Sequence, residues 1–526
     1  KNIMKKLLCV LLAAIMLLSF AACTVSGDGD GTTTAATTTG EPEVKDPGIT
    51  IATKNKEIFF SFVRPEKCGQ ILRDAGTTLV QRVADFSGGR VEYSDDWYRE
   101  ESEIKPNEVL IGATNRKESK AHTEDLSAND WYIRVVDVKI VINGGSESAV
   151  AVAVKYFIAT YIEGKDEINI PSKLDKLYIS EAKTIDLLSV IDKVKVIGRS
   201  MKTESGITCD WTASGIEFTA ECEGEVSVGV TVMKAASSYS GDCYFTVFVD
   251  GERSPQRLEA KVGDNELTLA SGLPKGVHTF RLLKQSHIAH ANSEIKSISL
   301  NGTVGARPED KELCFEFIGD SITCGYGLAG EYVANKETEA AGNAYYCDGT
   351  KTYAFLASEA LGADYSMVSV SGWLLSWSSG FGNSIPRTYY PYYNQIRNKT
   401  QYDFRARIPN AVVINLGTND YSKSTADKNP VKAEDFKKDL MTFVGEIREY
   451  YGKADLPVIF ITNAMNNGFQ SQVNEGVAGL GGESAGVYVL KTTLNREGMG
   501  NHPNCAAQEA TGKELVALLK AKGIVK

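Results

Sequence analysis

The sequence predicts an α/β domain over residues 309–526, preceded by a β-sandwich of the jelly-roll type over residues 195–305 and a small α+β domain over residues 49–190. Three observations carry this prediction. After residue 309, short apolar runs alternate with amphipathic stretches, as strands and helices do around a parallel sheet. The middle segment holds short runs of alternating polarity at close intervals, which is typical of a sandwich. The first segment shows strand-like runs followed by one helical pattern, which favours a small α+β unit.

The composition is that of a soluble globular protein, with 43% hydrophobic and 24% charged residues among 526. A formal net charge of −10 argues against nucleic acid as a partner. The ten cysteines include no CxxC pair and no zinc-ligand spacing, so we expect no metal and no cofactor. Cys209, Cys222 and Cys243 share the β-rich segment, where a disulfide is one alternative and buried free thiols are the favoured one.

The first residues predict a secretion signal over residues 1–23, with Lys5 and Lys6 ahead of an apolar run and small residues at its end. Phe20-Ala21-Ala22-Cys23 resembles a bacterial lipobox, although Phe20 stands where that motif prefers Leu. It predicts lipidation of Cys23 and anchoring at the outside of a bacterial cell; an ordinary signal peptide is the alternative. Residues 24–48, rich in Thr, Gly, Ala and acidic residues, predict a flexible linker.

The segment 49–190 predicts strands at 108–112, 131–136 and 139–143, with a turn at Asp137. A helix follows Ser146, with apolar residues at the spacing of one helical face. No catalytic cluster is visible, so a spacer is favoured over a module that contacts the substrate.

The segment 195–305 contains Val226 to Val232, which alternates strictly as a half-buried strand does. Asp250-Gly251 is a strong hairpin signal. His287 and His290 fall between two predicted strands at i and i+3. Because no Cys, Asp or Glu cluster accompanies them in sequence, a solvated loop is favoured over a metal site.

The strongest chemical signal is the motif GDSITCGYG at residues 319–327, directly after the apolar run Leu313 to Ile318. Its glycines allow a sharp turn that leaves Ser321 at the carboxyl end of a buried strand, where ligands of open α/β sheets bind. Ser321 is therefore a candidate nucleophile. The alternative is a strand-to-helix turn in which Ser321 or Thr323 acts only as an N-cap.

A serine nucleophile needs a base, and His502 is the only histidine that follows Ser321 in the chain. Between them, Val412 to Leu416 predicts another buried strand, and it ends in the polar turn Gly417 to Asp420. In that turn Asn419 can offer an amide donor to an oxyanion.

Four blocks, namely GDSITCGYG, Ser371-Gly372, GTND at 417–420 and His502-Pro503, resemble in order the blocks of the SGNH (GDSL-like) hydrolases. The resemblance covers about residues 309–526. It implies a flavodoxin-like three-layer fold, Ser321 as nucleophile and His502 as base. It further implies an oxyanion hole made by the Ser321 N–H, the Gly372 N–H and the Asn419 side chain. The extended motif behind a β-rich segment is most similar to carbohydrate esterase family two, which removes acetyl groups from plant polysaccharides.

One position departs from the family pattern. Most SGNH enzymes have an aspartate three residues before the histidine, and here Met499 stands there. Some members of carbohydrate esterase family two orient the histidine with a backbone carbonyl, so the resemblance implies a Ser–His dyad.

Aromatic residues follow Gly372 closely and predict a carbohydrate substrate. Trp373, Trp377, Tyr389 and Tyr390 are expected to bind it, since aromatic faces suit the apolar faces of sugar rings. Packing of a long loop is the alternative. The leading hypothesis is thus a carbohydrate O-acetyl esterase, against a lipase- or thioesterase-like SGNH hydrolase and a surface glycan-binding lipoprotein with a vestigial hydrolase domain.

Overall fold

The computed structural model describes residues 46–526 apart from residues 99, 242, 379 and 427 and the segments 121–125, 127–128, 236–240, 330–343, 381–382 and 395–398. The predicted signal peptide with Cys23, and the predicted linker up to residue 45, lie outside the described residues. Among the described residues, no helix is both long and apolar enough to span a membrane.

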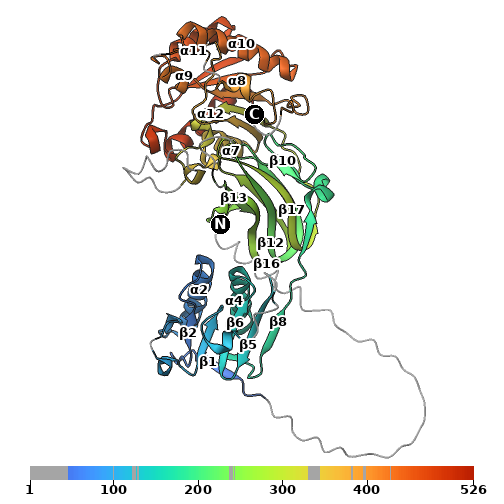
Figure 1. Ribbon diagram of the computed structural model, residues 1–526, viewed down its shortest axis with the longest axis vertical. Helices are drawn as coiled ribbons and strands as arrows, with labels where there is room; N and C mark the ends of the chain where they lie inside the picture. Colours follow the sequence, from blue (N-terminus) through green and yellow to red (C-terminus); the bar gives the residue numbers. More distant parts are fainter. Residues whose placement is uncertain are drawn as a thin grey trace, which may run out of the picture. The chain divides into compact units, whose positions relative to one another are not determined.

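The first folded segment is a mixed six-stranded sheet with two long helices (Figure 1). Its order is β3-β2-β4-β6-β5-β8, parallel from β3 to β6 and antiparallel beyond. The predicted strands are β4, β5 and β6, Asp137 takes a positive φ of 57° in the turn, and the Ser146 side chain caps α4. The elements are β1 (Ile49–Thr53), β2 (Ser61–Arg64), α2 (Gln70–Ser87), β3 (Tyr93–Asp95), η1 (Glu101–Glu103), β4 (Glu108–Ile111), α3 (Lys117–Lys120), β5 (Trp131–Val136), β6 (Lys139–Gly144), α4 (Glu147–Tyr161), β7 (Glu167–Ile170) and β8 (Asp175–Tyr178).

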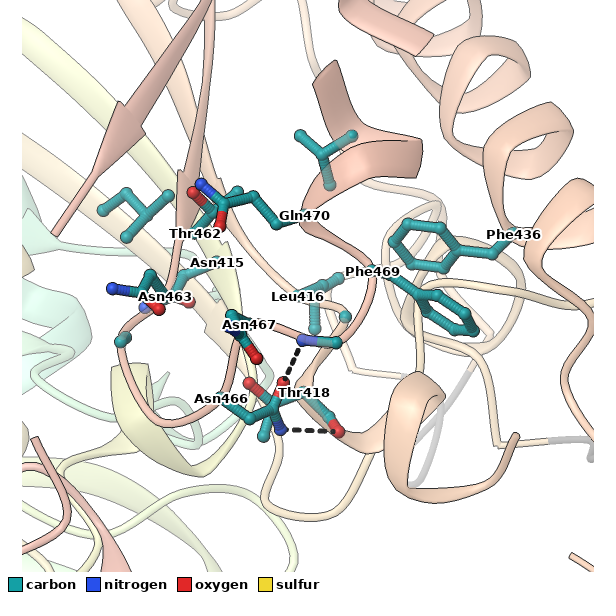
Figure 2. Close-up of a pocket in the computed structure, with 15 residues that line it drawn as sticks. Asn415, Leu416, Thr418, Phe436, Thr462, Asn463, Asn466, Asn467, Phe469 and Gln470 are labelled. Carbon is teal, nitrogen blue, oxygen red and sulfur yellow. Dashed lines mark hydrogen bonds between the residues drawn. The ribbon is translucent and has the colours of Figure 1, made fainter. Parts of the chain in front are cut away.

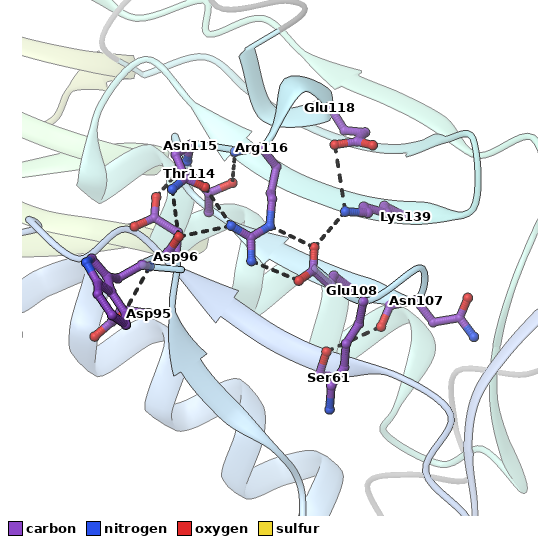
Figure 3. A network of polar contacts seen from close by, with 12 residues as sticks. Ser61, Asp95, Asp96, Asn107, Glu108, Thr114, Asn115, Arg116, Glu118 and Lys139 are labelled. Atoms are coloured by element: carbon purple, nitrogen blue, oxygen red, sulfur yellow. Dashed lines mark hydrogen bonds and ion pairs between the residues drawn. The ribbon is translucent and has the colours of Figure 1, made fainter. Parts of the chain in front are cut away.

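A buried ion network joins β4, β6 and the α3 segment of this unit (Figure 3). Arg116 donates two hydrogen bonds of 3.0 Å to the Glu108 carboxylate, and Lys139 donates a third of 2.7 Å. Burial alone would raise the pKa of Glu108, but the hydrogen bonds from Arg116 and Lys139 outweigh it and hold that pKa below its usual value. The charges of this network are paired with one another, which offsets the cost of burying them.

The β-rich segment forms a nine-stranded antiparallel sheet in which β12, β16 and β17 are long. The predicted hairpin is confirmed: Asp250 and Gly251 have φ of 52° and 84° between β13 and β14, as a type I′ turn requires. The elements are β9 (Lys183–Asp186), η2 (Leu187–Lys193), β10 (Lys195–Ile197), β11 (Ile207–Thr208), β12 (Gly215–Lys234), β13 (Cys243–Val249), β14 (Glu252–Arg253), β15 (Leu258–Ala260), β16 (Gly263–Lys284) and β17 (Ala291–Val304).

These strands hydrogen-bond as one connected sheet, whereas the sequence predicted the two sheets of a jelly roll. The pairing of β12 with β16 shifts register between Cys222 and Ser227, where bulges let each strand bend and continue. A pattern of short alternating runs therefore reflects segments of long bent strands. β9 also pairs with β17, so this sheet includes residues that precede residue 195.

The carboxyl-terminal segment is a five-stranded parallel sheet of order β19-β18-β20-β21-β22, which is the flavodoxin-like order. Its elements are β18 (Cys314–Gly319), α5 (Ser321–Cys324), η3 (Ala344–Tyr346), η4 (Gly349–Lys351), α7 (Tyr353–Ala360), β19 (Asp364–Ser369), α8 (Ile385–Thr388), β20 (Ala411–Asn415), α9 (Thr418–Ser422), α10 (Ala433–Tyr451), β21 (Val458–Thr462), α11 (Gln470–Gly479), η5 (Gly482–Ala485), β22 (Val487–Lys491), η6 (Met499–Asn501) and α12 (Cys505–Ala521).

Alternate residues of the central strand enter two different cores. Phe317 of β18 belongs to a cluster with Tyr353 of α7 and Leu515 of α12. Its neighbour Ile318 belongs to the other cluster, with Phe436 of α10. Each such fully buried side chain contributes roughly 1.5–3 kcal/mol. Helices therefore cover both faces of the sheet in three layers, which leaves the carboxyl ends of the strands open for the site.

A buried ion pair connects the β-rich segment to β18. The side chains of Arg199 and Glu316 are 0% and 2% exposed, and Arg199 Nη2 lies 2.7 Å from Glu316 Oε1. The guanidinium also lies 3.9 Å from the ring centre of Tyr402, and the Tyr390 hydroxyl donates to Glu316 Oε2 at 2.7 Å. Each charge is thus paired with the other, while Arg199 Nε has no hydrogen-bond partner among the described residues.

Candidate active site

Ser321 lies in a sharp turn at the carboxyl end of β18. The turn is tight enough that a Cβ on Gly319 would lie 2.0 Å from Thr323 Oγ1, which explains the glycine. The N-cap of the short helix α5 is Asp320, whose side chain accepts from the Ile322 N–H at 3.0 Å. Since Asp320 performs the capping, the alternative in which Ser321 serves only as an N-cap is not supported, and the Ser321 hydroxyl is available for chemistry.

The structure brings His502 to Ser321, with His502 Nε2 2.7 Å from Ser321 Oγ. On the other side of the ring, Nδ1 lies 3.0 Å from the Gly500 carbonyl oxygen and 3.2 Å from that of Met499. A carbonyl only accepts, so Nδ1 carries the proton and the Nε2 lone pair faces the serine hydroxyl. This is the geometry of a nucleophile with its general base.

The orienting group is thus the main chain, as the resemblance allowed. Gly500 has φ of 58°, a left-handed conformation in the turn η6 that directs its carbonyl oxygen to the imidazole. The Met499 side chain is buried, and a Cβ on Gly327 would lie 2.7 Å from the Met499 Cβ. Met499 therefore packs against the turn that follows the nucleophile. Glu497, the nearest carboxylate in sequence, instead accepts hydrogen bonds from Asn495 and Asn504.

The environment of His502 keeps it neutral. Burial lowers the pKa of its imidazole below 6.5, and the hydrogen bonds to the Gly500 and Met499 carbonyls oppose this without cancelling it. A neutral imidazole at neutral pH is the form that accepts a proton from Ser321.

Two backbone amides are available to an oxyanion. Gly372, with φ of 79°, follows β19 and lines the same pocket as Ser321. Among the described residues, neither the Ser321 N–H nor the Gly372 N–H has a hydrogen-bond partner. Both amides can therefore donate to a ligand in this pocket.

Asn419 lines the pocket, but its amide is already engaged. Its Nδ2 donates to Asp320 Oδ2 at 3.1 Å and to the Trp373 carbonyl oxygen at 3.0 Å. The role of Asn419 as an oxyanion donor stays a prediction: its amide holds the turn that carries Gly372, and donation to an oxyanion would replace one of these two bonds.

The pocket around the dyad has a volume of about 480 Å³. The described residues that line it are mostly polar and comprise Ser321, Ser371, Gly372, Thr418, Asn419, Tyr421, Ser422, Ser424, Thr425, Met465, Asn466, Arg496 and His502. Two of these residues, Tyr421 and Arg496, were not predicted from the sequence. Tyr421 is signalled by its place in the same helical turn as Asn419, whereas nothing in sequence marks Arg496.

The aromatic residues predicted to bind the substrate are not among those lining residues. Tyr389 and Tyr390 are 3% and 0% exposed and belong to the core beneath the sheet, so their assignment to the substrate is wrong. Trp373 and Trp377 are half-buried against the same core, and Arg387 stacks 3.9 Å above the ring of Trp377. The alternative, packing of the long loop, therefore explains all four aromatic residues, because their rings lie in or against the hydrophobic core.

A second cavity lies beside the pocket, at the ends of β20 and β21, and Figure 2 shows its lining. Asn466 Nδ2 donates to the Thr418 carbonyl oxygen at 3.3 Å, and the Gly468 N–H donates to Asn466 Oδ1 at 3.2 Å. Its volume of about 30 Å³ is roughly that of one water molecule, so it is too small for a substrate. The hydrogen bonds of Asn466 across this cavity help to hold the turn that carries Asn419.

Two other predictions are settled by burial and bonding. His287 and His290 are 1% and 2% exposed, so the predicted solvated loop is wrong. Burial, with the Lys284 ammonium as a smaller cause, lowers the pKa of His290 to about 4. The cysteines among the described residues are free thiols, including Cys209, Cys222 and Cys243.

Comparison with known proteins identifies two domains. Residues 315–515 match the GDSL-like Lipase/Acylhydrolase family, and residues 196–308 match the Carbohydrate esterase 2 N-terminal family. The resemblance inferred from the four sequence blocks is therefore confirmed.

Individual relatives agree with these matches. The chain is 30% identical over 257 residues to "Cellulase/esterase CelE" of Acetivibrio thermocellus, covering 48% of this chain and 29% of that protein. It is 22% identical over 230 residues to "Acetylxylan esterase / glucomannan deacetylase" of Cellvibrio japonicus, covering 42% of this chain and 58% of that protein. A solved structure of a family two carbohydrate esterase from Clostridium thermocellum, in complex with cellohexaose, is 26% identical with a TM-score of 0.55, covering 63% of this chain and 100% of that one. The chain thus spans less than two thirds of each of the two curated relatives.

Proposed function

We propose that this chain, which carries a GDSL-like lipase/acylhydrolase domain behind a carbohydrate esterase 2 N-terminal domain, is a carbohydrate O-acetyl esterase. The observation that carries the proposal is the distance of 2.7 Å between His502 Nε2 and Ser321 Oγ, at the carboxyl edge of a parallel sheet. The substrates are acetylated plant polysaccharides or oligosaccharides, a class supported by the names of the two curated relatives.

The acylation step follows from the geometry. Ser321 Oγ attacks the acetyl carbonyl carbon while its proton passes to His502 Nε2. The negative charge that develops on the carbonyl oxygen is stabilised by the N–H groups of Ser321 and Gly372, each such donor contributing roughly 3 kcal/mol. The Gly500 carbonyl stabilises the imidazolium through Nδ1–H. His502 then gives its proton to the sugar oxygen, and the deacetylated sugar leaves.

Deacylation repeats these roles with water. His502 Nε2 removes a proton from a water molecule, which attacks the carbonyl carbon of the acetyl-serine. The tetrahedral intermediate collapses with release of acetate, and the proton returns to Ser321 Oγ. Every proton transfer in this cycle passes through His502, and the steps use groups of the chain itself.

The lining of the pocket favours sugars over long acyl chains. Most of the lining residues carry a hydroxyl, amide, imidazole or guanidinium group, whereas a lipase needs an apolar channel for its acyl chain. The lipase- or thioesterase-like alternative predicts faster turnover of long-acyl esters than of acetyl esters. Comparing p-nitrophenyl acetate with p-nitrophenyl octanoate and decanoate separates the two.

The position in the cell and the role of the other segments complete the proposal. The signal-like start and the motif ending at Cys23 favour a lipoprotein at the outer surface of a bacterial cell, with the 24–48 linker as tether. The 49–190 segment then acts as a spacer. We also propose that the bent sheet of the β-rich segment folds on itself as a jelly roll, since inward residues from both ends of β12, such as Phe218 and Val230, share one core.

The test is the variant Ser321→Ala, measured as acetate release from acetylated xylan, acetylated mannan and p-nitrophenyl acetate. We expect kcat to fall by at least about 10³-fold with the near-UV circular dichroism unchanged. Ser422→Ala is the matched control, because Ser422 lines the same pocket and its hydroxyl is exposed and remote from the dyad's proton path. Turnover like that of the unmodified protein in Ser321→Ala would refute the assignment. Polysaccharide binding without deacetylation by the unmodified protein would favour the vestigial, glycan-binding alternative.

A further inference from the structure

Three buried side chains outside the active site converge at the junction of two segments. His287 and His290 come from the connection between β16 and β17, and Cys347 comes from the segment between η3 and η4. One nitrogen of each ring and the Cys347 sulfur all lie within 4.8 Å of one another. The three residues are 1%, 2% and 0% exposed.

The chemistry of these three atoms selects the ligand. Two imidazole nitrogens and a thiolate suit Zn²⁺, while Ca²⁺ and Mg²⁺ require oxygen ligands. Zinc bonds of about 2.0–2.3 Å at tetrahedral angles put neighbouring ligand atoms about 3.5 Å apart. Since the atoms of the cluster lie within 4.8 Å of one another, binding would bring them closer by at most about 1.3 Å.

We propose that His287, His290 and Cys347 form a zinc site that fastens the β16–β17 connection to the segment carrying Cys347. Three protein ligands leave a fourth position, which a water molecule fills. Binding through His287 Nδ1 replaces its long 3.3 Å hydrogen bond from the Ala289 N–H. The Cys347 thiol gives up its proton when the metal–sulfur bond forms, so binding releases one proton.

The site supports the turn that holds the nucleophile without taking part in its chemistry. The Asp348 N–H donates to the Gly325 carbonyl oxygen at 2.9 Å, and Gly325 ends the helix α5 that begins at Ser321. The Gly349 N–H donates to the Gln285 carbonyl oxygen at 2.9 Å, two residues before His287. The zinc would therefore close a loop of contacts between the β-rich segment and the turn that follows Ser321.

Two neighbouring positive charges oppose a cation, and the first is the Arg257 guanidinium, which donates to the Cys347 carbonyl oxygen at 3.5 Å. The second is Lys284, which is fully buried and whose ammonium donates to the backbone carbonyl oxygens of Asp210 and Ala291. The Cys347 thiolate and the buried Asp348 carboxylate next to it supply the compensating negative charge. Asp348 is itself paired with Arg253 at 2.9 Å, so the thiolate carries most of this compensation.

The experiment measures zinc bound to the full chain, produced with added zinc, purified without a histidine tag and dialysed exhaustively. We expect about one zinc ion per chain in the unmodified protein, and less than about a tenth of that in Cys347→Ser and His290→Gln. His278→Gln and Cys314→Ser are the matched controls: His278 pairs with Asp250, Cys314 lies on β18, and both variants should retain the zinc. Zinc loading should raise the melting temperature of the unmodified protein but not that of Cys347→Ser.

A second measurement does not depend on the variants folding. Cobalt(II) bound in place of zinc should give a thiolate-to-metal charge-transfer band in the unmodified protein. Absence of that band, absence of stoichiometric zinc, or full zinc retention by Cys347→Ser would each overturn the proposal. The readouts do not involve ester hydrolysis, so failure here is distinguishable from failure of the proposed function.

Discussion

His502 Nε2 lies 2.7 Å from Ser321 Oγ, although 181 residues separate the two in the chain. The fold brings them together because Ser321 follows β18 and His502 follows β22, and the carboxyl ends of parallel strands share one edge of the sheet. This contact makes Ser321 the nucleophile and His502 its base, and the surrounding residues determine how activity depends on pH and on substitution.

The acid limb of the pH profile should report His502. Burial lowers the pKa of its imidazole, and protonation of Nε2 removes the base. Activity is therefore fully present above that pKa and lost as pH falls through it, so the limb of kcat/KM for p-nitrophenyl acetate should lie below pH 6.5. A limb near pH 7 would contradict this and point to Asp320, whose pKa burial raises to about 7.

Met499 should matter for packing and not for catalysis. Met499→Leu conserves volume and should cost less than about 1.5 kcal/mol with kcat unchanged, since the orienting carbonyls remain. Met499→Asp buries a carboxylate against the turn at Gly327 and should cost about 3–5 kcal/mol in urea unfolding. A rise in kcat for Met499→Asp would show instead that a carboxylate at this position can orient His502.

Asn419 should act on kcat through the turn that it holds. Asn419→Ala removes the bonds to Asp320 and to the Trp373 carbonyl, so the turn that carries the Gly372 N–H should shift, and we expect kcat to fall about 10²-fold with little change in KM. Ser424→Ala is the control, because Ser424 lines the same pocket while its hydroxyl donates to the Tyr421 carbonyl oxygen, and this variant should lose less than about tenfold. Equal losses in both variants would argue against a special role for Asn419.

Tyr421 should contribute to sugar binding. Its ring is 44% exposed and lines the pocket. Tyr421→Ala should raise KM for acetylated oligosaccharides about tenfold, while p-nitrophenyl acetate, which has no sugar, should be hydrolysed as before. Tyr421→Phe keeps the aromatic ring, so its KM for acetylated oligosaccharides should rise less than that of Tyr421→Ala. An equal loss on both substrates would mean that Tyr421 supports the dyad instead.

The Arg199–Glu316 pair should control stability. Arg199→Ala leaves the Glu316 carboxylate buried without its partner and should cost about 3–5 kcal/mol in urea unfolding. Lys513→Ala breaks an exposed pair with Glu509 on α12 and should cost less than about 0.5 kcal/mol. A cost below about 1 kcal/mol for Arg199→Ala would show that water or Tyr402 replaces the lost interaction.

Short sequence motifs were enough to predict the Ser321–His502 dyad and the β13–β14 hairpin. The glycines around Ser321 and the scarcity of histidines after it led to the dyad, and the Asp250-Gly251 pair led to the hairpin. These signals work because each depends on a few neighbouring residues and on the general rule that strand ends share an edge.

The parts that failed depend on contacts between distant residues. An aromatic ring in a long loop packs or binds according to what surrounds it, and Tyr390 packs because Glu316 and Arg199 lie beneath it. Cys347 is far in sequence from His290, so their convergence had no local signal. Likewise, β12 continues through its bulges and pairs with β16 and β17 on both sides of them, which the alternating sequence pattern does not signal.

The carbonyl of Gly500 gives the dyad a property that a carboxylate would not. A main-chain oxygen has no proton to gain or lose near neutrality, and it is present whatever side chain its residue carries. A change in the path of the backbone would move it away from the imidazole, and a β-branched residue at position 500 would force one, because the left-handed φ there excludes it. The glycine two places ahead of the histidine is therefore the residue in this sequence on which the orientation of the imidazole depends.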